Sequence, residues 1–143
     1  MTNFATKIMM AAATLAVAAG AASAQTLKAE IPFAFRVGNT VMAAGNYEVS
    51  QLTRHSGSPV YRIRDARAEK AITLLPQAAS DPSKTSSAKG QPVLAFDCVA
   101  DHCALASIWT GPGSPAYKIR HGDLGNEAPV RVALVAMHAE KSE

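Results

Sequence analysis

The sequence is poor in the residues from which small metal, redox and nucleic-acid-binding sites are built. Its 143 residues include two cysteines and one tryptophan, and only 17% of them are charged. The formal net charge of +3 is too small to indicate a nucleic-acid-binding surface, which carries a dense basic patch. We therefore expect no nucleic-acid partner.

The short motifs that mark common catalytic sites are also missing. Neither G-x-S-x-G nor H-E-x-x-H occurs in the sequence. The four histidines lie apart, in predicted loops or near the C-terminus: His55, His102, His121 and His138. We therefore predict no catalytic residues, no metal site and no cofactor, and expect that the protein is not an enzyme.

A run of apolar residues stands near the N-terminus, at Ile8–Ala19. Lys7 precedes it, and Gly20 and the A-x-A pattern of Ala22–Ala24 follow. This order of a positive residue, an apolar run and small residues is typical of a secretory signal peptide. The run is shorter than the roughly 20 apolar residues that a membrane-spanning helix needs. A cleaved signal is therefore favoured over an uncleaved anchor.

Cleavage is expected between Ala24 and Gln25, which removes residues 1–24. Residues 25–143 then form the mature chain, which is long enough for a single domain with one hydrophobic core. No cysteine lies near the cleavage site to carry a lipid anchor. We predict a periplasmic or secreted protein whose mature chain does not insert into a membrane.

Apolar and polar residues alternate in the stretch LKAEIPFAFRV, from Leu27 to Val37. A period of two is typical of a strand with one buried face. Pro32 cannot donate a ladder hydrogen bond, so this strand lies at an edge or turns that nitrogen away from a partner. Similar patterns and turn signals predict further strands at Thr40–Met42, Asn46–Leu52, Val60–Arg64, Ala71–Pro76, Val93–Cys98, Cys103–Trp109 and Val130–Met137.

Short strands separated by turn signals indicate an all-β fold. We predict a small antiparallel barrel or a two-sheet sandwich of about seven to nine strands. Two segments do not fit the strand pattern. Residues 77–91 have no apolar period and are rich in Ser, Ala, Lys and Pro, which predicts a flexible loop. Ala116–Asp123 fits either a short strand or a helical turn.

Both cysteines lie in the stretch CVADHC, at Cys98 and Cys103. If the flanking strands form a hairpin with Val99–His102 as its loop, the two cysteines face each other directly. Opposed residues of antiparallel strands have a Cα separation that a disulfide accepts. An oxidising compartment favours the bond, so we predict a disulfide between Cys98 and Cys103.

The same register pairs Phe96 with Leu105 and Asp97 with Ala104. Other kinds of cysteine site fit less well. A structural zinc site usually takes four ligands from two separated pairs. Thioredoxin-like couples need C-x-x-C, and covalent haem attachment needs a histidine directly after the second cysteine. The disulfide is the interpretation that needs the fewest further residues.

Basic residues gather in the region from Arg54 to Arg67, and two interpretations apply to them. They are Arg54, His55, Arg62, Arg64 and Arg67. The cluster fits a shallow anion site or a solvated strand face. The solvated face is favoured, because no glycine-rich loop or aromatic platform accompanies the cluster.

Two functions are consistent with the sequence. The first is a non-catalytic structural or interaction protein of the envelope or the secreted space. The alternative is a binder of a small apolar ligand with a site inside the barrel. Small inward residues would leave room for a ligand and bulky ones would fill the interior, and both kinds are present: Ala29, Ala95 and Ala106 against Phe33, Phe35, Phe96 and Trp109.

The stretch IPFAFRVGNTVMAAGNYEV resembles a family of small exported bacterial β-rich proteins of unknown function. Their mature N-termini read V-P-F-x-F-x-V-G-x-x-x-L-P-A-G-x-Y-x-V. The matching residues are Pro32, Phe33, Phe35, Val37, Gly38, Ala44, Gly45, Tyr47 and Val49. A second stretch, LAFDCVADHCALASIW, is similar to a hairpin of that family through Phe96, Leu105, Ile108 and Trp109.

The sequence departs from that family at two points. Ala43 stands where the family usually has proline, and the two cysteines are not part of its pattern. The resemblance implies a compact β fold and carries over no activity and no site. The shared residue types specify packing and turns more readily than chemistry.

Overall fold

The structure is a computed structural model that describes residues 26–52, 59–67, 70–84 and 89–139. The predicted signal peptide and its cleavage site lie outside these residues, as do Arg54 and His55. Strands dominate the described chain, which confirms the predicted all-β class. Within this part of the chain, no helix has the length and apolar character needed to cross a membrane.

The described strands are eleven in number and most are short. They are β1 (Thr26–Ile31), β2 (Phe35–Val37), β3 (Thr40–Met42), β4 (Gly45–Leu52), β5 (Val60–Asp65), β6 (Ala71–Leu74), β7 (Ala78–Ser80), β8 (Val93–Val99), β9 (His102–Trp109), β10 (Ala116–Lys118) and β11 (Arg131–Ala139).

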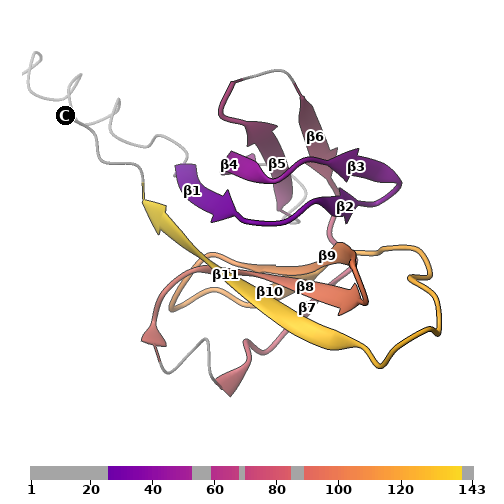
Figure 1. The fold of residues 1–143 in the computed structure, drawn as a ribbon. Helices are drawn as coiled ribbons and strands as arrows, with labels where there is room; N and C mark the ends of the chain where they lie inside the picture. Colours follow the sequence, from indigo (N-terminus) through magenta and orange to yellow (C-terminus); the bar gives the residue numbers. More distant parts are fainter. Residues whose placement is uncertain (1–25, 53–58, 68–69, 85–88, 140–143) are drawn as a thin grey trace, which may run out of the picture.

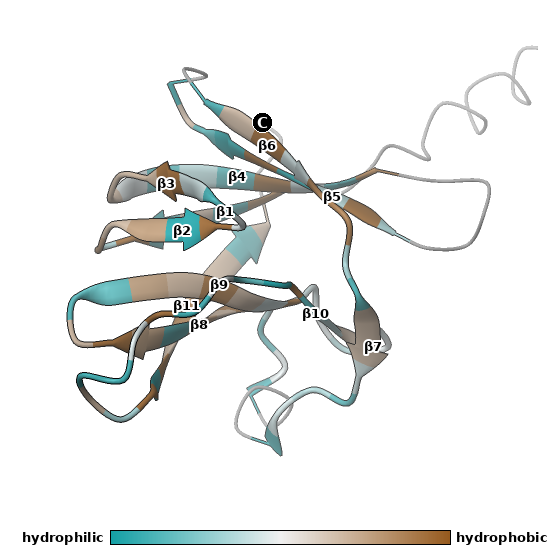
Figure 2. Cartoon of the chain, turned by 90° about the vertical axis from the view of Figure 1, so that its right-hand side faces the viewer, coloured by the Kyte–Doolittle hydropathy of each residue, from teal (hydrophilic) through white to brown (hydrophobic). Residues whose placement is uncertain are grey.

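These strands form one sheet that curls over on itself into a half-barrel with two layers (Figure 1). Its order is β3-β2-β9-β8-β11-β1-β4-β5-β6, and β10 pairs with both β9 and β7. Strands β1 to β6 form one layer and β7 to β11 the other (Figure 2). Antiparallel pairing of β1 with β11 joins the layers, and β2 meets β9 through a parallel pair, Arg36 and Ala104.

The predicted strand from Leu27 to Val37 is divided in two by Pro32 and the residues after it. Strand β1 ends at Ile31, and the chain then passes to β2 in a different part of the sheet. A proline lacks the N–H that would continue the ladder, so the break falls at this residue. The predicted burial of the odd positions of β1 is confirmed, with Leu27, Ala29 and Ile31 all at most 3% exposed.

Aromatic side chains fill the space between the two layers. The ring of Phe35 lies edge-on to Tyr47 and to Phe96, with centroid distances of 5.2 and 5.4 Å. Phe33 packs against Phe96 in the same manner, at 5.1 Å. Edge-to-face pairs of this kind add to the stabilisation that burial of the rings already supplies. The interior of the half-barrel is therefore occupied by its own bulky residues.

Strand β11 presents its most apolar face to the outside. The sequence places Val130, Val132, Leu134 and Ala136 on one face of the predicted strand, and in the structure Val132 is 63% exposed and Leu134 47%. Register decides this orientation. Ala133 is paired with Phe96, whose side chain lies in the core. The neighbours of Ala133 in β11, Val132 and Leu134, therefore face away from the core.

One further segment differs from the sequence-based expectation, and the structure decides another that the sequence left open. Residues 77–91, expected as a loop without regular structure, contain β7, because Ala78–Ser80 pair with the main chain of Ala116–Lys118. The same pairing decides the open question at Ala116–Asp123, whose first three residues form β10. Main-chain pairing imposes both strands, since neither has an alternating pattern of its own.

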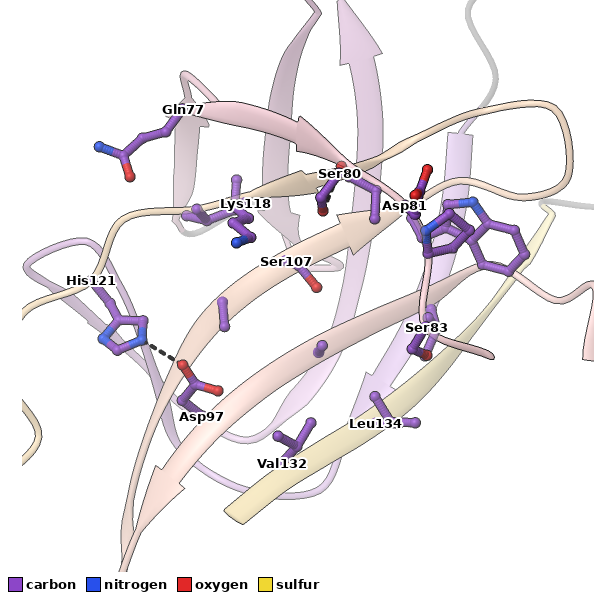
Figure 3. A pocket seen from close by; sticks show the side chains of 17 residues that line it. Gln77, Ser80, Asp81, Ser83, Asp97, Ser107, Lys118, His121, Val132 and Leu134 are labelled. Atoms are coloured by element: carbon purple, nitrogen blue, oxygen red, sulfur yellow. Dashed lines mark hydrogen bonds and ion pairs between the residues drawn. The ribbon is translucent and has the colours of Figure 1, made fainter. Parts of the chain in front are cut away.

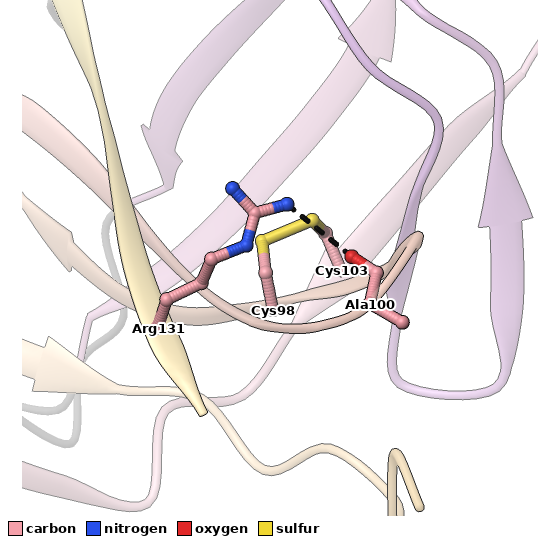
Figure 4. Close-up of a disulfide and its surroundings, with 4 residues drawn as sticks. All are labelled: Cys98, Ala100, Cys103 and Arg131. Carbon is pink, nitrogen blue, oxygen red and sulfur yellow. Dashed lines mark hydrogen bonds between the residues drawn. A yellow bond between two sulfur atoms is a disulfide. The ribbon is translucent and has the colours of Figure 1, made fainter. Parts of the chain in front are cut away.

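The predicted disulfide is present in the β8–β9 hairpin. Cys98 lies directly opposite Cys103, and their sulfur atoms form a disulfide (Figure 4). The expected pairs of Phe96 with Leu105 and Asp97 with Ala104 are also confirmed. The turn is shorter than expected, since the strands extend to Val99 and His102 and leave two residues between them.

Candidate functional site: a groove on the outer face of the sheet

A groove of about 720 Å³ lies on the outer face of β8, β9 and β11, the face opposite to the aromatic core (Figure 3). We call it the outer groove. Its apolar lining comes from Val93, Ala95, Ala106, Trp109, Ala116, Ile119, Val132 and Leu134. Its charged lining comes from Asp81, Asp97, Lys118 and His121. The groove therefore combines an apolar floor with a polar rim, as small-molecule sites do.

Small side chains and a β-bulge create the floor of the outer groove. Ala95 pairs with Ser107, whereas the next residue, Phe96, pairs with Leu105. Ala106 is therefore the extra residue of a bulge in β9, and such bulges redirect neighbouring side chains. Ala95, Ala106 and Ser107 all line the groove, and their short side chains leave its centre open.

The sequence raised the question of whether small or bulky residues face the interior, and the structure separates them. Ala95 and Ala106 line the outer groove, while Phe35 and Phe96 are at most 2% exposed on the other face of the sheet. Along a strand, successive side chains point to opposite faces, so Ala95 and Phe96 serve opposite sides of β8. The outer groove therefore lies on the face of β8 opposite to Phe96.

Main-chain hydrogen bonds hold the wall of the groove in place. The amide of Gln77 donates to the carbonyl of Lys118 at 3.0 Å, and the amide of Ile119 donates to the carbonyl of Ala106 at 2.8 Å. The indole Nε1 of Trp109 donates to the carbonyl of Ser114 at 2.8 Å, which fixes the ring at the edge of the floor. The bonds to Ala106 and from Trp109 anchor both ends of β10 against β9, and the bond from Gln77 joins β10 to the segment before β7.

His121 and Asp97, which both line the groove, form an ion pair with each other (Figure 3). The Nε2 atom of His121 lies 2.8 Å from Oδ2 of Asp97, and its Nδ1 atom lies 2.8 Å from the carbonyl oxygen of Gly122. A carboxylate and a carbonyl both accept hydrogen bonds, so the two ring nitrogens are best satisfied when both carry a proton. The geometry favours the imidazolium form.

Burial of the ring opposes this charge, but the Gly122 carbonyl and the Asp97 carboxylate favour it, and the pKa of His121 is raised above its usual value. A raised folded-state pKa means that the pair stabilises the fold fully below about pH 6.5. That contribution is lost as the pH rises through the raised pKa of His121.

Replacing Asp97 by asparagine is expected to lower the pKa of His121, because the substitution removes the negative charge and keeps a hydrogen-bond acceptor in place. The measurement is a titration of the His121 ring signals by NMR in the wild-type and Asp97→Asn proteins. Resonances of His102, which lies in the β8–β9 hairpin outside the groove, provide the internal control. An unchanged His121 titration would show that the pair does not exist in solution.

The disulfide and the strand residues Arg62 and Arg64 of the basic cluster lie away from the outer groove. Cys98 and Cys103 are part of the core cluster on the other face of the sheet. Arg62 and Arg64 lie on β5 in the other layer, and Arg64 is paired with Glu48. That ion pair supports the interpretation of a solvated strand face. Within the described ranges, no group of three His, Cys, Asp or Glu side chains is arranged to hold a metal ion.

The sequence points to Ala95 and Ala106 as residues that would leave room for a ligand, but it does not identify the polar residues of the groove. In the sequence His121 stands apart from the other histidines, and its partner Asp97 lies 24 positions away. Lys118 falls in Ala116–Asp123, a segment whose sequence fits either a short strand or a helical turn. No local pattern links these residues, because strand pairing alone brings them together. Comparison with known proteins adds no assignment, since the sequence matches no protein-family model, no curated protein and no solved structure.

Proposed function

We propose that the protein is a non-catalytic binding protein of the periplasm or secreted space that holds a small, mainly apolar molecule in the outer groove. The observation that carries this proposal is the concave apolar surface formed by the exposed face of β11 and the small residues of β8 and β9. Soluble proteins rarely expose contiguous apolar surface to water, and where such surface is concave it marks a ligand-binding site.

The size of the groove favours a small molecule over a protein partner. Its volume of about 720 Å³ falls within the range of small-molecule pockets. A stable protein interface usually needs about 800 Å² of surface on each partner and is flatter. The interaction-protein hypothesis from the sequence is therefore the second candidate. Export and the resemblance to exported β-rich proteins stay predictions that agree with either role.

The polar groups of the groove support a non-catalytic role. A general base needs a ring nitrogen that can accept a proton from a bound molecule. Both nitrogens of His121 already face acceptors, the Asp97 carboxylate and the Gly122 carbonyl. The arrangement suits a fixed charge better than proton transfer.

The proposal predicts that the protein binds a neutral apolar probe and that filling the floor prevents binding. Trp109 lines the groove and is the single tryptophan of the chain, so its fluorescence reports occupancy. We expect N-phenyl-1-naphthylamine to bind protein purified from an oxidising periplasm. Ala95→Leu is expected to weaken this binding at least about tenfold, because the added side chain occupies the centre of the floor.

Ala136→Leu is the matched control for this experiment. Ala136 is exposed on β11 and does not line the groove, so the same added volume should leave probe binding unchanged. Thermal unfolding of both variants checks that each remains folded. Absence of probe binding to the wild-type protein, or equal binding by Ala95→Leu, would refute the proposed function.

A further inference from the structure

Four groove residues from neighbouring strands form one row across the sheet. Leu134 of β11 pairs with Ala95 of β8, Ala95 pairs with Ser107 of β9, and Ser107 pairs with Lys118 of β10. Residues paired across antiparallel strands point to the same face, and all four line the outer groove. The row is apolar at its β11 end and polar at its β10 end.

The charges around the groove differ from one end to the other. The carboxylate of Asp97 is engaged by His121 at 2.8 Å, so this pair carries little net charge when the ring is protonated. The ion pairs of the described chain do not include Lys118, whose exposed side chain brings a positive charge to the rim. Asp81, the remaining charged lining residue, lies on the other side of Lys118 from His121 (Figure 3).

We propose that the outer groove binds a monomeric amphiphilic carboxylate, with its anionic group at Lys118 and Ser107 and its apolar chain across Ala95 and Leu134. This inference rests on the proposed function and names the class of ligand. The side chain of Lys118 supplies a charge-assisted hydrogen bond, and the hydroxyl of Ser107 is the next polar group along the row.

The dimensions of the row agree with such a ligand. Three steps between neighbouring strands, from β11 to β10, cover roughly 14 Å. An extended medium-chain carboxylate has a comparable length. Its chain would cover the exposed side chains of Val132 and Leu134, which removes apolar surface from water. A cationic amphiphile would instead place its charge against Lys118.

The test compares three probes that share one chain length and differ in head group: decanoate, 1-decanol and decyltrimethylammonium, each below its micelle concentration. Trp109 fluorescence and calorimetry give the dissociation constants. We expect decanoate to bind about tenfold more tightly than decanol, since a charged hydrogen bond contributes more than a neutral one. The cationic probe is expected to bind more weakly than decanol.

Lys118→Gln is expected to abolish the preference for decanoate, so that the ratio of the two dissociation constants falls to near one. Arg120→Gln removes a positive charge two residues further along, outside the groove lining, and should keep the wild-type ratio. This control separates a contact at Lys118 from a general effect of net charge.

The outcomes distinguish this inference from the proposed function. Equal affinities of the wild-type protein for decanoate and decanol would overturn the carboxylate assignment and leave apolar-ligand binding intact. Absence of binding by every probe would overturn both. Binding only to micelles or to vesicles of anionic lipid would also overturn both, because a membrane surface would then be the partner.

Discussion

Phe96→Ala is expected to lower the free energy of unfolding by about 3–5 kcal/mol, the largest effect of any single substitution considered for this protein. Phe96 is fully buried and contacts the rings of both Phe33 and Phe35. Truncation removes the burial of the ring and both edge-to-face contacts, and it leaves a cavity in the core that further lowers stability. A loss of this size is a large part of the stability of a domain of this length.

Urea unfolding followed by Trp109 fluorescence measures the effect, because the indole is 3% exposed and hydrogen-bonded in the folded state. Phe96→Leu is included because the alanine variant can fail to fold. The leucine variant is expected to lose less, since most of the volume is kept. Leu134→Ala is the surface control, and its side chain is 47% exposed. Similar losses for Phe96→Ala and Leu134→Ala would show that the core is placed on the wrong face of the sheet.

Removal of the Cys98–Cys103 disulfide is expected to cost about 2 kcal/mol, which is the loop-entropy contribution of so short a closed loop. Both cysteines are buried, at 1% and 6% exposure, so alanine is preferred to serine, whose hydroxyl would lack a partner. The hairpin register should survive in the double alanine variant. Core pairing of Phe96 with Leu105 holds it, and Arg131 donates to the carbonyl of Ala100 at 3.2 Å (Figure 4).

Intact-mass measurement and urea unfolding test this prediction together. The native protein purified from an oxidising periplasm is expected to be two hydrogens lighter than the reduced protein. The wild-type protein that has been reduced while unfolded should show the same loss of stability as the double alanine variant. Because the reduced protein keeps both cysteine side chains, this comparison controls for the change in side-chain volume. A mass that does not change on reduction would disprove the bond, and an unaltered unfolding midpoint would show that the bond contributes nothing to stability.

The cysteine hairpin illustrates how far local sequence information reaches. Two adjacent strands joined by a short turn have few possible registers, and the buried positions of Phe96 and Leu105 select one of them. The alternating stretch after Thr26 is predictable for the same reason, since a period of two shows that the two faces of β1 differ. Pro32 marks where that strand ends. Each of these signals depends only on residues close together in the chain.

The outer groove depends on contacts between residues far apart in the sequence. Strand β11 has an alternating pattern with apolar residues at Val132 and Leu134, yet these face outward because its pairing with β8 turns the other face to the core. Periodicity shows that two faces differ but does not show which of them meets the core, and here the sheet carries apolar residues on both sides.

The all-β class, the approximate positions of the strands and the register of the disulfide hairpin are predictable from the sequence, because they follow from period, turn residues and short-range pairing. Contacts between distant strands were needed to establish which sheet face is outside, that β7 and β10 pair, and that His121 meets Asp97 in the groove that Lys118 also lines. Those features arise from strand order and from a bulge at Ala106, and neither is encoded in any single stretch of the chain.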